Sequence, residues 1–194
     1  MDKQNIEIGF LDSYCAETSV VPRVIDHLLE DLHKLKFPQE EIDEIILSMD
    51  ESITNAIQET IKKNSNINTC HDNSDRRDIT VRYTISENSF DATIIDHGKG
   101  LDIFNILNSV PDIKSESYSD EIISYATESE KSKIKVRING EEIPLRGIGA
   151  GLKIILNFMD TVTIDLIDKE KIISDSVTEH TDGTIFNMKR KRRY

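Results

Sequence analysis

A carboxylate and an amide stand four residues apart in the chain, where they could act together on one ligand. Glu51 and Asn55 occupy positions i and i+4, which share one face of an α-helix. The amide oxygen of Asn55 can bind Mg²⁺, a hard cation that accepts neutral oxygen ligands beside phosphates and water. The carboxylate of Glu51 can orient and deprotonate a hydroxyl nucleophile. A solvated polar face with no ligand would give the same spacing.

Glycine is scarce, with 8 in the chain, yet most of it gathers in two clusters that could wrap one ligand. Glycine is needed where the backbone approaches a ligand closely or takes a positive φ. The second cluster feeds a predicted helix, whose free N–H groups and positive dipole end suit phosphates. Two ordinary tight turns are the alternative. The clusters are Asp96-x-Gly98-x-Gly100 and Gly147-x-Gly149-x-Gly151, the latter preceded by Arg146 and followed by Leu152.

Apolar periodicity predicts the elements that would carry these residues. Two helices come first, one ending before Pro38 and one over residues 39–62 that holds Glu51 and Asn55. The remaining pattern indicates helices over 101–108 and 152–159 and strands over 6–11, 79–85, 90–95, 162–167, 171–177 and 184–189. This order predicts a two-layer α/β sandwich, with a mixed sheet packed on helices.

Residues 109–145 are long, polar and poorly periodic. A structureless segment of that length inside a small domain usually serves as a lid or a mobile loop. Its position between the two glycine clusters predicts a lid that closes over a nucleotide and is ordered by its terminal phosphate. A disordered insertion indifferent to nucleotide is the alternative.

The overall charge excludes some classes of function. The chain has 194 residues, 24 basic and 36 acidic, and thus a net charge of −12. This acidity argues against direct binding to nucleic acid, whose phosphates would be repelled. The exception is the basic run 189–193, interpreted as a solvated tail or as a docking patch for anions.

Location is inferred from what the sequence lacks. No apolar stretch is long enough for a membrane span, and residues 1–11 do not resemble a signal peptide. Cys15 and Cys70 lie far apart without a CxxC motif, which predicts neither a disulfide framework nor a zinc site. We therefore expect a cytoplasmic protein with two inert thiols and no membrane contact.

The order of the motifs carries a family resemblance. Glu51-x-x-x-Asn55-Ala56, Asp96-x-Gly98-x-Gly100, Gly147-x-Gly149-x-Gly151-Leu152 and Gly183-Thr184 together resemble the boxes of the GHKL ATPase superfamily. The likeness is strongest to the bacterial anti-sigma factor serine kinases of the SpoIIAB and RsbW type. It extends over residues 6–189 and implies the GHKL (Bergerat) form of the α/β sandwich. Residues 1–194 would be one ATP-binding domain, with a lid at about 109–145 and a basic tail at 189–194.

The resemblance also implies roles for individual residues. Glu51 would be the catalytic base and Asn55 the Mg²⁺ ligand. Asp96 would accept a hydrogen bond from the adenine amino group, with Thr184 beside it near the base. The remaining binding residues would be Gly98 and Gly100 along the base, Gly147, Gly149 and Gly151 around the phosphates, Leu152 at the helix start and Arg146 at the phosphates or the partner. Glu59 departs from the pattern, because many relatives have histidine there.

The implied function is an ATP- and Mg²⁺-dependent protein serine kinase that acts as an anti-sigma factor. It would phosphorylate a STAS-type anti-anti-sigma protein, bind a sigma factor as a second partner and form a homodimer. One alternative is an ATP-gated binding module without kinase turnover. The other is a detached histidine-kinase catalytic domain, which His27 and His33 do not favour because neither lies in the acidic context of a phospho-acceptor site.

Overall fold

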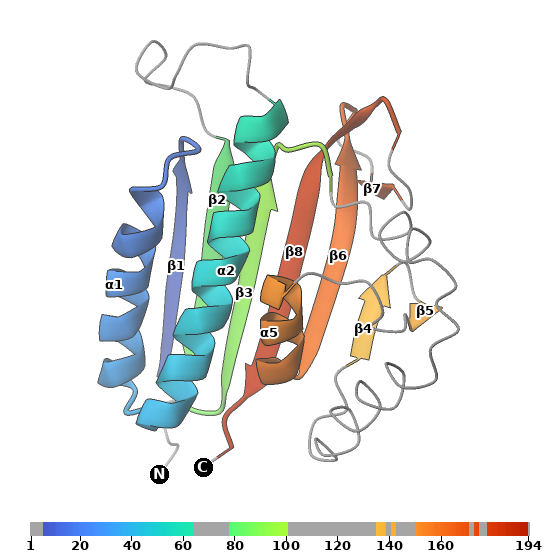
Figure 1. The fold of residues 1–194 in the computed structure, drawn as a ribbon. Coiled ribbons are helices and arrows are strands. Elements are labelled where there is room, and N and C mark those ends of the chain that lie inside the picture. Colours follow the sequence, from blue (N-terminus) through green and yellow to red (C-terminus); the bar gives the residue numbers. More distant parts are fainter. Residues whose placement is uncertain are drawn as a thin grey trace.

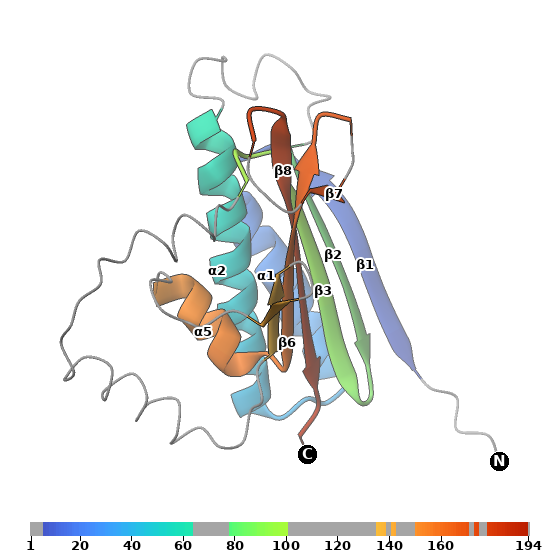
Figure 2. The same ribbon diagram turned by 90° about the vertical axis from the view of Figure 1, so that its right-hand side faces the viewer.

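The protein is built as one sheet with its helices packed on one face (Figure 1, Figure 2). The computed structural model describes residues 6–63, 78–100, 135–138, 141–142, 150–170, 173–174 and 178–193. The helices are α1 (Val20–Lys34), α2 (Gln39–Lys63) and α5 (Ala150–Phe158). The strands are β1 (Glu7–Tyr14), β2 (Ile79–Ser86), β3 (Ser89–Asp96), β4 (Lys135–Ile138), β5 (Glu141–Glu142), β6 (Thr161–Asp168), β7 (Ile173–Ser174) and β8 (Thr181–Lys191).

Within the described part of the chain the sheet has eight strands, in the order β1-β2-β3-β8-β6-β4-β5, with β7 paired to β6. All strand pairs among the described residues are antiparallel except β4 with β6, so the sheet is mixed, as predicted. The C-terminal strand β8 lies between β3 and β6 in the middle of the sheet. It therefore brings Thr184 directly opposite Asp96.

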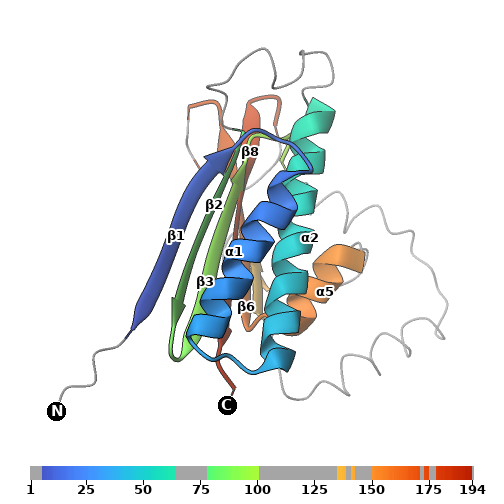
Figure 3. The same cartoon turned by 90° about the vertical axis from the view of Figure 1, so that its left-hand side faces the viewer.

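The core lies between the sheet and the helices (Figure 3). Alternate side chains of β2 point into it, because successive residues of a strand face opposite sides of the sheet. On α2 the buried apolar residues recur at helical spacing, so one stripe faces the sheet while both flanks of the helix stay available. The core residues of these two elements are Ile79, Val81, Tyr83 and Ile85 from β2 and Ile42, Ile45, Met49, Ile53 and Ile57 from α2.

A buried polar cluster fixes α1 on the sheet. The hydroxyl of Tyr83 on β2 donates a hydrogen bond to Oδ2 of Asp31 on α1, at 2.8 Å. Lys34 donates to the other oxygen of the same carboxylate, also at 2.8 Å. The Asp31 carboxylate is buried, and buried polar groups stabilise a fold only when they are hydrogen-bonded in this way.

The predicted elements that the structure describes are confirmed in kind, but several of their bounds differ. β1 ends three residues after its predicted end, and β8 begins three residues before its predicted start. Of the predicted strand 171–177, only β7 (Ile173–Ser174) lies within the described residues. α5 begins at Ala150, two residues before the predicted start.

Within the predicted lid, β4 and β5 form strands, so the expectation of a segment without regular structure is wrong for those residues. β4 needs no alternating pattern of its own, because its backbone pairs with the edge of β6. The predicted helix 101–108 and the rest of the lid lie outside the described residues.

The basic run at the C-terminus is not a solvated tail. Its first three residues belong to β8, and Arg190 is 1% exposed, forming an ion pair with Glu44 of α2. Arg192 donates hydrogen bonds to the backbone carbonyls of Leu35, Lys36 and Glu87. The expectation failed because a run of cations in sequence says nothing about which carboxylates and carbonyls the fold brings to meet it.

The cysteine interpretation is also corrected. Cys15, at the end of β1, is disulfide-bonded. The second cysteine of the sequence, Cys70, lies outside the described residues. Spacing along a chain does not reveal spatial proximity, so the expectation of an inert free thiol is wrong for Cys15. Among the described residues, no helix is long and apolar enough to cross a membrane.

Candidate functional site

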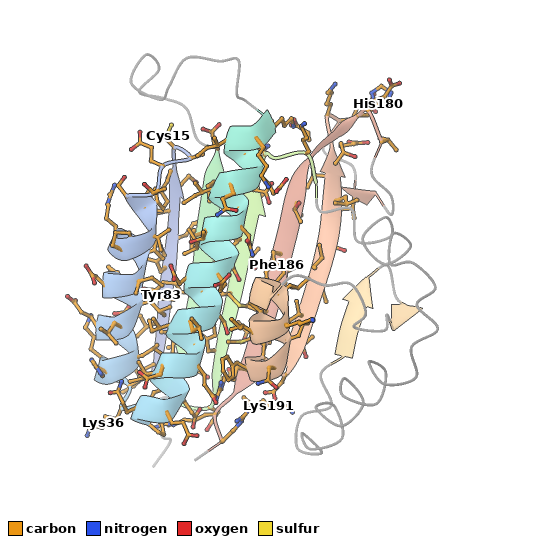
Figure 4. All side chains as sticks on the ribbon, in the orientation of Figure 1. Cys15, Lys36, Tyr83, His180, Phe186 and Lys191 are labelled. Carbon is orange, nitrogen blue, oxygen red and sulfur yellow. The ribbon has the colours of Figure 1, made fainter. Side chains whose placement is uncertain are left out.

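The predicted site residues that the structure describes gather between α2, α5 and the centre of the sheet. A cavity of about 60 Å³ lies there, under the flank of α2 that faces α5. Figure 4 labels Phe186, one of the lining residues, between these two helices over β8. The cavity is lined by Ser52, Asn55, Ala56 and Glu59 from α2, Ile94 and Asp96 from β3, Leu152 and Ile155 from α5, and Thr184 and Phe186 from β8.

Asp96 is the buried charge of this cavity. Its side chain is 6% exposed and ends strand β3. The backbone N–H of Gly98 donates to Oδ1 of Asp96 at 2.7 Å, and the Thr184 hydroxyl forms a second hydrogen bond with this carboxyl group. Burial raises the pKa of Asp96 to about 6, although these hydrogen bonds act in the opposite direction, and the nearby charge of Glu59 adds to the rise. The cavity therefore holds an acceptor that can be neutralised just below neutral pH.

Glycines are required where the chain passes close to Asp96. A side chain on Gly98 would come within 2.9 Å of Cβ of Glu59, and one on Gly183 would collide with the carbonyl oxygen of Asp96. Real Cβ atoms do not approach other atoms so closely, so both positions need glycine for space. Gly100 has φ of 83°, a left-handed conformation that glycine adopts without strain.

Glu51 and Asn55 face the start of α5 rather than bulk solvent alone. A Cβ on Gly151 would collide with the carboxylate of Glu51 and would lie 3.6 Å from Nδ2 of Asn55. The interpretation of a wholly solvated face is therefore wrong for Glu51, which is half-buried, whereas Asn55 is exposed. The carboxylate of Glu51 lies beside the first turn of α5, where the dipole and free N–H groups of a helix stabilise negative charge. The glycine permits this close approach of two helices.

A clamp that the sequence analysis missed holds the loop after Asp96. Nζ of Lys63, in the last turn of α2, donates to the carbonyl of Gly98 at 3.0 Å and to Oδ1 of Asp182 at 2.7 Å. His97 also approaches Asp182, with Nδ1 3.6 Å from Oδ2. Burial alone would raise the pKa of Asp182, but Lys63 and His97 outweigh it and hold that pKa below its usual value. This clamp joins α2, the loop after β3 and the start of β8.

Of the lining residues that the sequence analysis did not assign to the site, one had a usable signal in the sequence and others had none. Glu59 follows Asn55 by four residues, so the same i, i+4 rule that paired Glu51 with Asn55 would have placed it on this flank. Phe186 and Ile94 could be assigned only once β8 was known to pair with β3. Arg146, Gly147 and Gly149 lie outside the described residues.

No family model and no curated protein matches the chain. Among solved structures, the fold is similar to a chain in the crystal structure of the SiaB-SiaC complex from Pseudomonas aeruginosa. The similarity covers 94% of this chain and 88% of that chain, with a TM-score of 0.51 and 10% sequence identity. At this identity the likeness concerns the fold: the chain shares the two-layer α/β architecture of that structure.

Proposed function

We propose that the protein binds ATP at this cavity and is a protein serine kinase that regulates transcription by partner switching, as an anti-sigma factor. The cavity would widen from its volume of about 60 Å³ as the base enters. The observation that carries the proposal is the buried carboxyl group of Asp96, which lines the cavity together with apolar side chains and the Thr184 hydroxyl. An adenine ring offers an amino group to a carboxylate and flat faces to apolar walls. Guanine would instead turn a carbonyl oxygen toward Asp96, which the carboxylate repels.

The donors present fit a magnesium nucleotide. The exposed amide of Asn55 would supply one oxygen ligand to Mg²⁺, which usually keeps several waters and binds substrate phosphates. The cation would neutralise charge on the phosphates. Asn55 and Glu51 adjoin Gly151 at the start of α5, and the resemblance assigns the phosphates to the loop that precedes this helix.

Glu51 is the proposed base. Its carboxylate would orient the serine hydroxyl of the substrate protein and accept its proton as the hydroxyl oxygen bonds to the γ-phosphorus. The bond from that phosphorus to the bridging oxygen breaks, and ADP leaves. Because this carboxylate acts on the nucleophile, the protein needs it for transfer and not for holding the nucleotide.

The proposed partners are a STAS-type anti-anti-sigma protein and a sigma factor, with the kinase itself a homodimer. The structural neighbour was crystallised as a complex of two different proteins, which supports a role in binding a partner protein. An ATP-gated binding module without turnover would use the same cavity and the same partners. The two functions differ in one measurable property: only the kinase transfers a phosphoryl group to its partner.

The test combines the full chain, γ-labelled ATP, Mg²⁺ and purified STAS-domain proteins from the same genome. We expect label on a serine of one of them. Glu51→Gln should lower transfer by at least a hundredfold while changing ATP affinity less than about threefold. Glu40→Gln, which removes an exposed carboxylate in the first turn of α2 that lines neither this cavity nor the hollow between α1 and α2, is the matched control and should retain transfer. If ATP binds but no phosphoryl group is transferred, the protein is not a kinase and the ATP-gated binding module remains. If ATP does not bind, both the kinase and the binding module are refuted.

A further inference from the structure

A second hollow lies on the opposite flank of α2, between this helix and α1. Its volume is about 540 Å³. Successive residues of a helix turn by about 100°, so Asp43, Ile46 and Asp50 project away from the flank of α2 that lines the nucleotide cavity. Leu47 lies one turn before Glu51, on the solvent side. The α1–α2 groove, as we call it, is lined by Val21, Pro22 and Ile25 from α1 and by Asp43, Ile46, Leu47 and Asp50 from α2.

The floor of the α1–α2 groove is apolar and only partly covered. Val21, Ile25 and Ile46 pack against the core with one side and are half-buried. Leu47 is 39% exposed although it is a large apolar side chain. A single exposed leucine is ordinary, but here it adjoins apolar residues of a second helix around one hollow. Such a surface gains free energy when an apolar side chain from another molecule displaces its water.

Two carboxylates stand at the two ends of this floor. Asp43 and Asp50 are seven residues apart on α2, which places them about 10 Å apart along the axis, with Leu47 between them. Asp43 accepts a hydrogen bond from the neutral amide of Gln39 at 2.8 Å. Among the described residues, neither carboxylate forms an ion pair with a cation. Both are therefore available to positive groups on a binding partner.

We propose that the α1–α2 groove binds an amphipathic helix of a partner protein. That helix would place an apolar stripe on Leu47 and its neighbours, with Lys or Arg residues two turns apart facing Asp43 and Asp50. The spacing follows from the geometry, because positions i and i+7 of a helix share a face and lie about 10 Å apart. The net charge of −12 also attracts a basic partner and repels anionic lipid surfaces and nucleic acids.

This inference goes beyond the proposed kinase and does not rest on it, because the groove shares no residue with the nucleotide cavity. A partner helix on one flank of α2 and a nucleotide on the other can therefore be tested separately. Failure of ATP binding would leave the groove proposal standing, and the reverse also holds.

The probe is a synthetic 18-residue helix with leucines at i, i+3, i+4 and i+7 spacing and lysines flanking that stripe seven residues apart. Its binding to the full chain is followed by fluorescence anisotropy, and its place by perturbation of backbone NMR signals. We expect signals of α1 and α2 around the groove to shift. Leu47→Lys should weaken binding at least tenfold, since it adds a cation to the apolar floor. Circular dichroism checks that this variant folds.

Charge is tested with matched double variants. Asp43→Asn with Asp50→Asn should weaken the lysine peptide about fivefold at low salt, because each exposed ion pair contributes only modestly. Glu170→Gln with Glu179→Gln removes the same charge from exposed positions elsewhere and should change affinity by less than twofold. A peptide with the same leucines and glutamates for lysines should not bind.

Four results would overturn the proposal. An equal loss in both double variants would mean that the attraction is diffuse, and equal binding of the glutamate peptide would mean that charge has no part in it. No binding of the lysine peptide would show that the groove does not accept such a helix. Concentration-dependent dimerisation that Leu47→Lys abolishes would show that a second copy of the chain covers the groove.

Discussion

At the scale of single residues, Asp96 is a buried carboxyl group whose pKa is raised toward neutral pH. A carboxylate that loses water on burial is destabilised in its charged form, and the hydrogen bonds from Gly98 and Thr184 compensate only in part. Its pKa of about 6 means that it is mostly ionised at pH 7 and mostly protonated at pH 5. A site that recognises a base through this carboxylate should therefore depend on pH.

The first prediction concerns ATP affinity. Asp96→Asn should weaken ATP binding at least tenfold and reduce the preference for ATP over GTP, because the acceptor for the adenine amino group is replaced by an amide that is free to present a donor. In the natural sequence, affinity should fall as the pH drops from 7.5 to 5. Isothermal titration calorimetry at both pH values measures this. Equal affinity for ATP and GTP in the unchanged protein would contradict it.

The second prediction concerns folding stability. Because the folded pKa of Asp96 lies above that of an unfolded aspartate, the folded state binds more protons between about pH 4 and pH 6. Its contribution to stability is therefore greatest in acid and is lost as the pH rises through 6. Relative to Asp96→Asn, the natural sequence should lose up to about 3 kcal/mol between pH 4 and pH 7. Urea denaturation of both proteins across this range is the measurement, and parallel profiles would refute the assignment.

At the scale of elements, α2 is the helix around which the two proposed binding surfaces are organised. One stripe packs on the sheet, the flank toward α5 lines the nucleotide cavity, and the flank toward α1 lines the groove. Its last turn also reaches the loop after β3 through Lys63, which contacts both the carbonyl of Gly98 and the carboxylate of Asp182. The position of the Asp96 loop thus depends on the C-terminal end of α2.

The third prediction tests this clamp. Lys63→Met should weaken ATP binding about fivefold, since a charged hydrogen-bond donor that positions the base-binding loop is lost. Lys169→Met is the matched control: the Lys169 side chain is exposed just after β6, lines neither the nucleotide cavity nor the α1–α2 groove, and forms no ion pair among the described residues. That variant should bind ATP within twofold of the natural sequence. Identical losses in the two variants would mean that general charge, and not the clamp, affects the nucleotide.

At the scale of the whole molecule, the two layers are joined by a buried charge cluster as well as by the apolar core. Arg190 of β8 lies in an ion pair with Glu44 and 3.9 Å from Oε2 of Glu41, both on α2, and donates to the carbonyl of Phe158 at 3.1 Å. The Arg190 and Glu41 side chains are almost fully buried. Removing one partner of a buried pair is costly, because the other charge remains without compensation.

The fourth prediction follows from this cluster. Arg190→Met should lower the free energy of unfolding by about 3 kcal/mol, since it leaves carboxylates of α2 buried beside an apolar side chain. Arg193→Met, which removes an arginine 3.8 Å from the same Glu44 but 41% exposed, should cost less than about 1 kcal/mol. Urea denaturation monitored by circular dichroism gives both values. Equal losses would show that burial does not distinguish the two arginines.

Local sequence patterns were enough to predict most helices and strands and to place the two polar candidate residues of α2 on one face of that helix. Apolar residues at helical spacing located the helix 39–62, and the i, i+4 rule put Glu51 and Asn55 on one face, because helix geometry is set by neighbours in the chain. The two strands around residues 79–96 were likewise predicted, since alternating burial shows directly in the sequence.

Only the tertiary structure showed which residues distant in the sequence are in contact. The insertion of β8 between β3 and β6 placed Thr184 opposite Asp96, and the packing of α5 on α2 placed Gly151 against Glu51. The same long-range packing buried Arg190, which sequence analysis had taken for part of a solvated tail, and let β4 pair with β6 without a strand pattern. Local sequence encodes propensity and periodicity, whereas these contacts join residues distant in the chain, and their free energy is gained only when the sheet is assembled.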